Sequence, residues 1–153
     1  MSLDLFLHEV EEGVPSLLVS HIPPYLLMGG LDHKSQKLFE NVVSVWLTSH
    51  TGDGCIKLSD LDQLADRTVH FIESHHVSIV LLEGIGDLVI HNDFQSVMHS
   101  LHRIMNSLSE HNSTLIVPIE PSAFEHRDLD VLERHMMMIW RRSADKGACD
   151  IQI

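Results

Sequence analysis

The stretch Val77-Ser78-Ile79-Val80-Leu81-Leu82-Glu83-Gly84 decides the fold of this chain. Five of its first six residues are apolar and several are β-branched, a composition typical of a strand buried on both faces. The run ends in a carboxylate and a glycine, and amphipathic helical patterns flank it on both sides. This arrangement predicts a central strand of a parallel sheet, with Glu83 at its carboxyl end.

The composition is that of a globular domain. The chain has 153 residues, of which 44% are apolar, so we predict a single α/β domain over residues 1–153. The chain has 10 Lys and Arg residues and 22 Asp and Glu residues, and the resulting formal charge of -12 argues against a nucleic-acid partner. The absence of a CxxC motif indicates a reduced, cytoplasmic protein. No apolar run approaches the ~18 residues of a membrane span.

Helical and strand patterns alternate along the chain. Helix-spaced apolar residues and strand-like runs follow one another, with uncertain order only between the first two strands. The helical stretches are residues 3–10, 34–41, 61–75 and 94–108, and the strand-like runs are 16–19, 42–47, 77–84 and 114–119. Alternation of this kind predicts a three-layer α/β fold, with a mostly parallel sheet of four to five strands and helices on both faces.

The carboxyl-terminal part carries a predicted interface. A capping box at Ser122-Ala123-Phe124-Glu125 predicts a last helix that runs to Arg141-Arg142. One helix face cannot bury the five consecutive apolar residues 136–140, so part of this segment should meet a partner, and we expect a homodimer or a hetero-complex. The interface residues expected are Met137, Met138, Ile139 and Trp140. The tail 143–153 is expected to be an edge strand or an interface segment.

Polar side chains follow four of the predicted strands. In open α/β sheets, ligands bind outside the carboxyl ends of the strands. The residues at these ends are His21, His50, Glu83 and Glu120. If the strands are neighbours, two imidazoles and two carboxylates converge and are suited to bind a divalent ion or to do acid–base work. The simpler alternative is that they are polar because strand ends meet water.

The motifs of common enzymes are missing. No GxxxxGK[ST] phosphate loop occurs, and the dinucleotide fingerprint that Gly84-Ile85-Gly86 would begin has Val89 in place of its third glycine. The strand that ends at Glu83 is similar to the Walker B strand of ATPases. Because the phosphate loop is missing, this similarity favours shared ancestry with ATPases over ATP hydrolysis by this chain. Neither HExxH nor GxSxG occurs. We therefore predict no cofactor, no metal and no catalytic residue.

Several short motifs between Gly13 and Met136 form a family pattern. They are Gly13-Val14-Pro15-Ser16-Leu17-Leu18-Val19 followed by Pro23-Pro24, Val45-Trp46-Leu47-Thr48, Leu81-Leu82-Glu83-Gly84 followed by Asn92-Asp93-Phe94, and Thr114-Leu115-Ile116-Val117-Pro118-Ile119-Glu120-Pro121 followed by Leu132-Glu133. On these motifs the chain resembles an archaeal domain family of unknown function, number 835. The resemblance implies a degenerate RecA-like fold, similar to circadian-clock-type ATPases without their phosphate loop.

The same resemblance implies a sensory or interaction module, often attached to signalling proteins. The chain departs from the family pattern at His21, where an arginine is frequent, and at Gly86-Asp87-Leu88, where an acid and an aromatic residue are frequent. Together these observations predict a non-catalytic signalling or protein-interaction domain of RecA-like descent, whose partner is a signalling protein. The alternative is a small-molecule, nucleotide or metal-binding protein or enzyme that uses His21, His50, Glu83 and Glu120.

Overall fold

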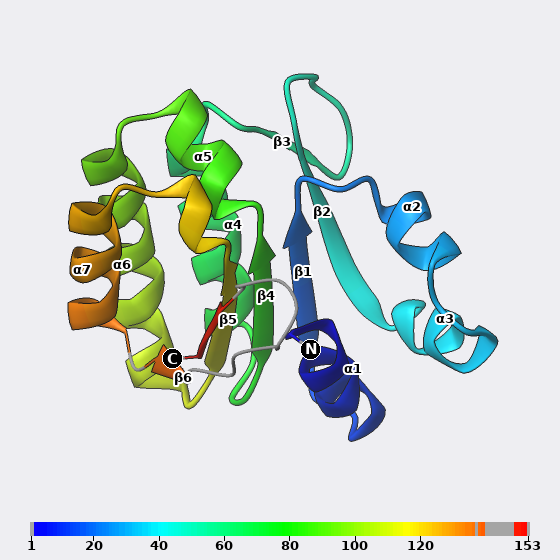
Figure 1. The fold of residues 1–153 in the computed structure, drawn as a ribbon. Helices are drawn as coiled ribbons and strands as arrows, with labels where there is room; N and C mark the ends of the chain where they lie inside the picture. Colours follow the sequence, from blue (N-terminus) through cyan, green and yellow to red (C-terminus); the bar gives the residue numbers. More distant parts are fainter. Residues whose placement is uncertain (1, 137, 140–148, 153) are drawn as a thin grey trace.

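The computed structural model describes residues 2–136, 138–139 and 149–152. Helices lie on both sides of one sheet (Figure 1). The helices are α1 (Ser2–Glu11), α2 (Pro24–Gly29), α3 (His33–Phe39), α4 (Leu61–Glu73), α5 (Ile85–His91), α6 (Phe94–His111) and α7 (His126–His135), with a 3-10 turn at Pro121–Ala123. The strands are β1 (Ser16–Ser20), β2 (Val42–Thr48), β3 (Cys55–Lys57), β4 (Ile79–Glu83), β5 (Thr114–Ile119), β6 (Met138–Ile139) and β7 (Cys149–Gln152).

The sheet has the order β3-β2-β1-β4-β5-β7-β6, so the stretch that ends at Glu83 forms its central strand. The strands from β3 to β5 are all parallel, and β7 and β6 are added in antiparallel orientation. The predicted α/β fold with a mostly parallel sheet is therefore confirmed. No helix of the described residues has the length and apolar character needed to cross a membrane.

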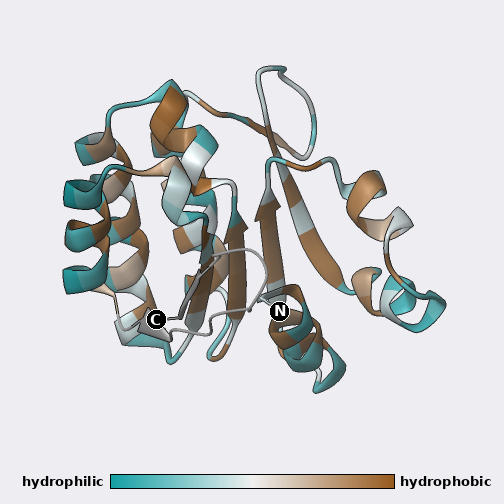
Figure 2. Cartoon of the chain, viewed as in Figure 1, coloured by the Kyte–Doolittle hydropathy of each residue, from teal (hydrophilic) through white to brown (hydrophobic). Residues whose placement is uncertain are grey.

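The central strand is apolar along its whole length because each face packs on a different layer of helices. Leu81 points to the side of α1 and α3, where it joins Phe6 and Ile116 in one core. Val80 and Leu82 point to the other side and join the larger core beneath α4 and α6. Figure 2 shows the brown strands enclosed between helices whose outer surfaces are largely teal. Residues on both sides of β4 are thus removed from water.

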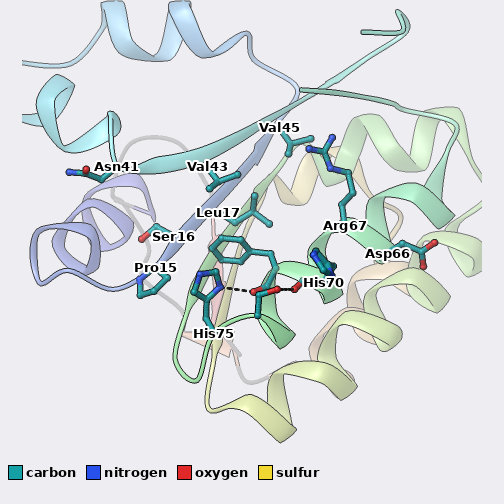
Figure 3. A pocket seen from close by; sticks show the side chains of 12 residues that line it. Pro15, Ser16, Leu17, Asn41, Val43, Val45, Asp66, Arg67, His70 and His75 are labelled. Atoms are coloured by element: carbon teal, nitrogen blue, oxygen red, sulfur yellow. Dashed lines mark hydrogen bonds between the residues drawn. The ribbon is translucent and has the colours of Figure 1, made fainter. Parts of the chain in front are cut away.

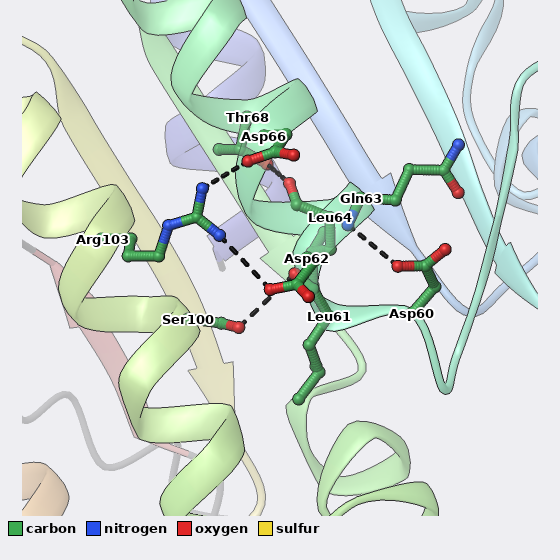
Figure 4. Close-up of polar contacts among 9 residues, drawn as sticks. All are labelled: Asp60, Leu61, Asp62, Gln63, Leu64, Asp66, Thr68, Ser100 and Arg103. Atoms are coloured by element: carbon green, nitrogen blue, oxygen red, sulfur yellow. Dashed lines mark hydrogen bonds and ion pairs between the residues drawn. The ribbon is translucent and has the colours of Figure 1, made fainter.

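The two long helices of the larger layer are each capped by an aspartate. Asp60 and Asp93 are the N-caps of α4 and α6, and each carboxylate accepts a hydrogen bond from a backbone N–H three residues on. Polar contacts also join the two helices across their exposed edge (Figure 4). Arg103 of α6 forms ion pairs with Asp66 and, at 3.5 Å, with Asp62, both on α4. The contacts bridge α4 and α6 at the surface, above the buried core that the two helices share.

Three short elements were not predicted. They are α2, β3 and α5. A helix of six or seven residues, or a strand of three, presents too few apolar positions to produce a recognisable period. The capping box at Ser122 was also wrong, because α7 begins only at His126 after Glu125, which makes no side-chain cap.

The predicted continuation of the last helix to Arg141-Arg142 is wrong. Helix α7 ends at His135, Met136 has an extended backbone, and Met138–Ile139 form strand β6. A run of apolar residues suits a strand, which has two sides, better than one face of a helix. The expected edge strand of the tail is found as β7, but it lies between β5 and β6 rather than at the edge. Met137 and Trp140 lie outside the described residues.

Candidate functional site

The neighbouring strands β1 and β4 form the point where the sheet reverses its winding. From β1 the chain continues to β2 on one side, and from β4 it continues to β5 on the other. The register places Ser20 beside Glu83, so both strands end level with each other. In open α/β sheets, this reversal leaves a crevice at the carboxyl ends of the strands, where ligands bind.

A cavity of about 360 Å³ lies at this crevice. Three of the four predicted site residues, His21, Glu83 and Glu120, are among the residues that line it. His50 does not line it, because β2 continues two residues past the register partner of Ser20 before it ends at Thr48. The imidazole of His50 is exposed and lies within hydrogen-bond distance of the hydroxyls of Thr48 and Ser49.

Glu83 takes part in hydrogen bonds that connect the ends of β1 and β4. The hydroxyl of Ser20 donates to Oε2 of Glu83 at 3.1 Å and accepts from the backbone N–H of Ile22 at 3.0 Å. The side chain of Trp46 on the next strand donates from Nε1 to the carbonyl of His21 at 3.2 Å. These bonds fix the path of the chain as it leaves β1.

Gly84 and His21 are packed directly on each other. Gly84 has a φ of +101°, in the left-handed region, and a Cβ built there would lie 2.6 Å from Nδ1 of His21. Any side chain at position 84 would therefore meet both backbone strain and the imidazole. The Nδ1 atom is buried without a hydrogen-bond partner among the described residues, and Nε2 lies 3.5 Å from Oδ2 of Asp87.

The rest of the crevice combines carboxylates with apolar side chains. Glu120 is exposed and accepts a hydrogen bond from the hydroxyl of Ser122 at 2.9 Å. Asp87, Phe124 and Ile90 also line the crevice, and Ile90 is 78% exposed. Such a lining is suited to bind a small ligand with a positive charge and an apolar part. Across the part of the chain that the structure describes, no group of three His, Cys, Asp or Glu side chains is arranged to hold a metal ion.

A second hollow, the β2–α4 groove, lies near the opposite, amino-terminal end of the sheet. Its volume is about 560 Å³, and Figure 3 shows the side chains that line it. Val43 and Val45 of β2 form one wall, while Arg67 and His70 of α4 contribute to the other. The groove could not be predicted from the sequence, because its apolar wall depends on the position of β2 near the border of the sheet. The order of the strands cannot be inferred from the residues of any one strand.

A family model matches most of the chain, including the strands that carry the two hollows. Residues 4–136 match the family model DUF835, described as a protein of unknown function. The chain belongs to the DUF835 family. The matched segment contains β1 to β5 and both hollows, and it ends before β6. A search of curated proteins finds no match. The family resemblance read from the motifs is thus confirmed, whereas archaeal origin and RecA-like kinship stay predictions.

Proposed function

We propose that this DUF835 protein is a non-catalytic signalling domain that acts by binding another protein. The observation that carries the proposal is the state of Glu83, the acid at the end of the central strand. Its carboxylate accepts a hydrogen bond from Ser20, whose hydroxyl also accepts from a backbone N–H. In this arrangement Glu83 joins two strands, which is a structural task.

The neighbouring polar groups support the same proposal. The hydroxyl of Ser20 donates to Glu83 and accepts from the backbone N–H of Ile22, and the hydroxyl of Ser122 donates to the exposed Glu120, so both hydroxyls are used in local hydrogen bonds. The imidazole of His21 is packed against Gly84 and points its Nε2 atom toward Asp87. Descent from a RecA-like ancestor is part of the proposal and rests on the family resemblance.

ATP turnover tests the proposal directly. We expect the purified protein to hydrolyse ATP no faster than buffer does, and Glu83→Gln to change nothing in this assay. Glu120→Gln is the matched control, because Glu120 lines the same crevice but is exposed and does not join the strands. Turnover that is clear in the wild type and lost in Glu83→Gln alone would overturn the proposal.

A second candidate function is the binding of a small ligand in the crevice. The observation that favours it is the convergence of His21, Glu83 and Glu120 on one cavity at the reversal of the sheet. Because Trp46 is hydrogen-bonded to His21, its fluorescence should report a ligand there. Titration with spermidine or arginine should change the emission of the wild type and not that of Asp87→Asn; equal responses would argue against this candidate.

The expected homodimer is part of the proposal as well. Strand β6 is the last strand on its side of the sheet among the described residues, and it contains Met138 and Ile139. A border strand can pair with a second chain. Sedimentation at micromolar concentration should therefore give a dimer, and a strict monomer would contradict this part of the proposal.

A further inference from the structure

The β2–α4 groove lies beside a strand whose outer side is only partly paired. Strand β2 pairs with β1 along five residues, from Val42 to Trp46, but it pairs with β3 only from Trp46 to Thr48. The first part of β2, Val42–Val45, therefore has no strand on its outer side among the described residues. Unpaired backbone groups at such a place are able to accept one more strand.

The direction of the free backbone groups follows from a hydrogen bond further along β2. The N–H of Trp46 donates outward to the carbonyl of Gly54 at 2.9 Å. Backbone groups alternate in direction along a strand, so Ser44 directs its own N–H and C=O to the same outer side. An extended segment laid beside Ser44 would find one donor and one acceptor ready for pairing.

The side chains of Val43 and Val45, on either side of Ser44 in the sequence, point to the opposite face of the sheet from the side chain of Ser44 and form an apolar floor. Val45 is buried in the core beneath α4, whereas Val43 is 50% exposed. Both line the groove (Figure 3). Phe71 of α4 is a further apolar residue of its lining. A strand added at Ser44 would place alternate side chains beside Val43 and Val45, where apolar residues would be covered.

The charges on α4 decide what kind of segment fits. Arg67 and His70 are exposed on the groove side of α4, and Arg67 has no ion-pair partner among the described residues. The nearby carboxylate of Asp66 is already paired with Arg103. A second copy of the chain would bring a second Arg67 to the same place, whereas an acidic segment would complement it.

We infer that the β2–α4 groove binds an extended acidic segment of another protein, which adds as a strand beside Ser44. Pairing with the backbone supplies general affinity, and the apolar floor with Arg67 selects alternating apolar residues and acidic flanks. The inference deepens the proposed function and rests on it, because it names the place and the chemistry of the partner.

Synthetic peptides test the inference on the full chain. The probe is a fluorescein-labelled peptide of alternating valine and threonine with glutamates at both ends. One control peptide has lysines in place of the glutamates, and another has a proline at its centre, which removes a backbone donor. We expect the acidic peptide to bind and both controls to bind at least roughly tenfold more weakly by fluorescence anisotropy.

Protein variants locate the binding. Val43→Lys and Arg67→Glu should each weaken the acidic peptide at least roughly tenfold. Val77→Lys and Arg127→Glu are the matched controls, because Val77 is 49% exposed and Arg127 is an exposed arginine, and neither lines the groove. Circular dichroism of each variant should show that the fold is retained.

Three results would overturn the inference. One is failure of the acidic peptide to bind the wild type at millimolar concentration, and another is unchanged binding to Val43→Lys. The third is a dimer of the wild type that Val43→Lys converts to a monomer, which would assign the groove to a second copy. The proposed function would fail on a different observation, namely ATP turnover by the wild type that is lost in Glu83→Gln.

Discussion

The two hollows, the crevice and the β2–α4 groove, lie near opposite ends of the sheet, and their residues differ in how far they are bonded to the rest of the fold. At the crevice, Ser20 and Glu83 are hydrogen-bonded to each other and Gly84 is packed against His21. In the β2–α4 groove, Val43 stays half exposed and the outer side of β2 is only partly paired. Ser20, Glu83 and Gly84 of the crevice are therefore expected to hold the fold together, whereas an exposed groove residue such as Val43 is expected to change at little cost to it. Stability measurements are able to separate these two roles.

The largest effect is expected in the core on which both hollows stand. Leu101 of α6 is 2% exposed and belongs to the same cluster as Val45 and Leu82. Leu101→Ala should lower the free energy of unfolding by roughly 2–5 kcal/mol, because it removes buried contacts and leaves a cavity. Urea denaturation measures the loss. An unchanged midpoint would show that the α6 stripe does not support the sheet.

A smaller but clear effect is expected at the crevice. Gly84→Ala forces a side chain into a left-handed backbone and against the ring of His21, so we expect a loss of about 1–3 kcal/mol. The emission of Trp46 should also shift, because its indole is bonded to the carbonyl of His21. Thermal unfolding with fluorescence detection gives both readings.

Gly30→Ala is the matched control for this comparison. Gly30 has a φ of -88°, and a methyl group added there would have the carbonyl oxygen of Leu27 as its nearest neighbour, at 3.7 Å, which is an ordinary contact. Its replacement should leave stability nearly unchanged. Equal losses at the two glycines would mean that the packing of His21 on Gly84 contributes little.

The sequence predicted those features that depend on one segment at a time. Glu83 ends a run whose apolar character is explained by burial on both faces, and residues 94–108 keep a helical period, so the end of β4 and the helix α6 were both predicted correctly. The features that depend on strand order were missed. His50 was grouped with the crevice, although β2 carries it past the end of β1. The groove at Val43 could be predicted only by knowing that β3 pairs with the last three residues of β2 and leaves the first part unpaired.

The length of α7 shows a second limit. Apolar residues continue the stripe of this helix beyond Leu132, and no glycine or proline marks its end at His135. Met138 and Ile139, in the run that follows, form β6, which pairs with β7. Strand pairing of this kind depends on a distant segment, so the helical period alone did not reveal the change.

A modest, pH-dependent effect is expected at the caps of the helices that surround the hollows. Hydrogen bonds from the side chain and backbone of Ser96 lower the pKa of the Asp93 carboxyl below its usual value. The stability that this ionised cap contributes is complete above the pKa of the unfolded chain, about 3.9, and is lost as the pH falls through the lower pKa of the folded protein. In Asp93→Asn the cap no longer titrates, so the difference in stability between variant and wild type should change only below about pH 4. A difference that changes near neutral pH would contradict this assignment.

The smallest effect is expected on the outer face of α6, where two histidines one turn apart differ in their contacts. His99 is exposed, whereas His102 is half-buried and meets the ring of His135 edge-on, with 4.9 Å between ring centroids. His99→Ala should therefore change the free energy of unfolding by less than about 0.5 kcal/mol. His102→Ala should cost more, because it removes a contact between α6 and α7. Chemical denaturation of the two variants side by side measures the difference. A large loss for His99→Ala would indicate that this face of α6 binds a partner or an ion, and binding surfaces would then not be confined to the two ends of the sheet.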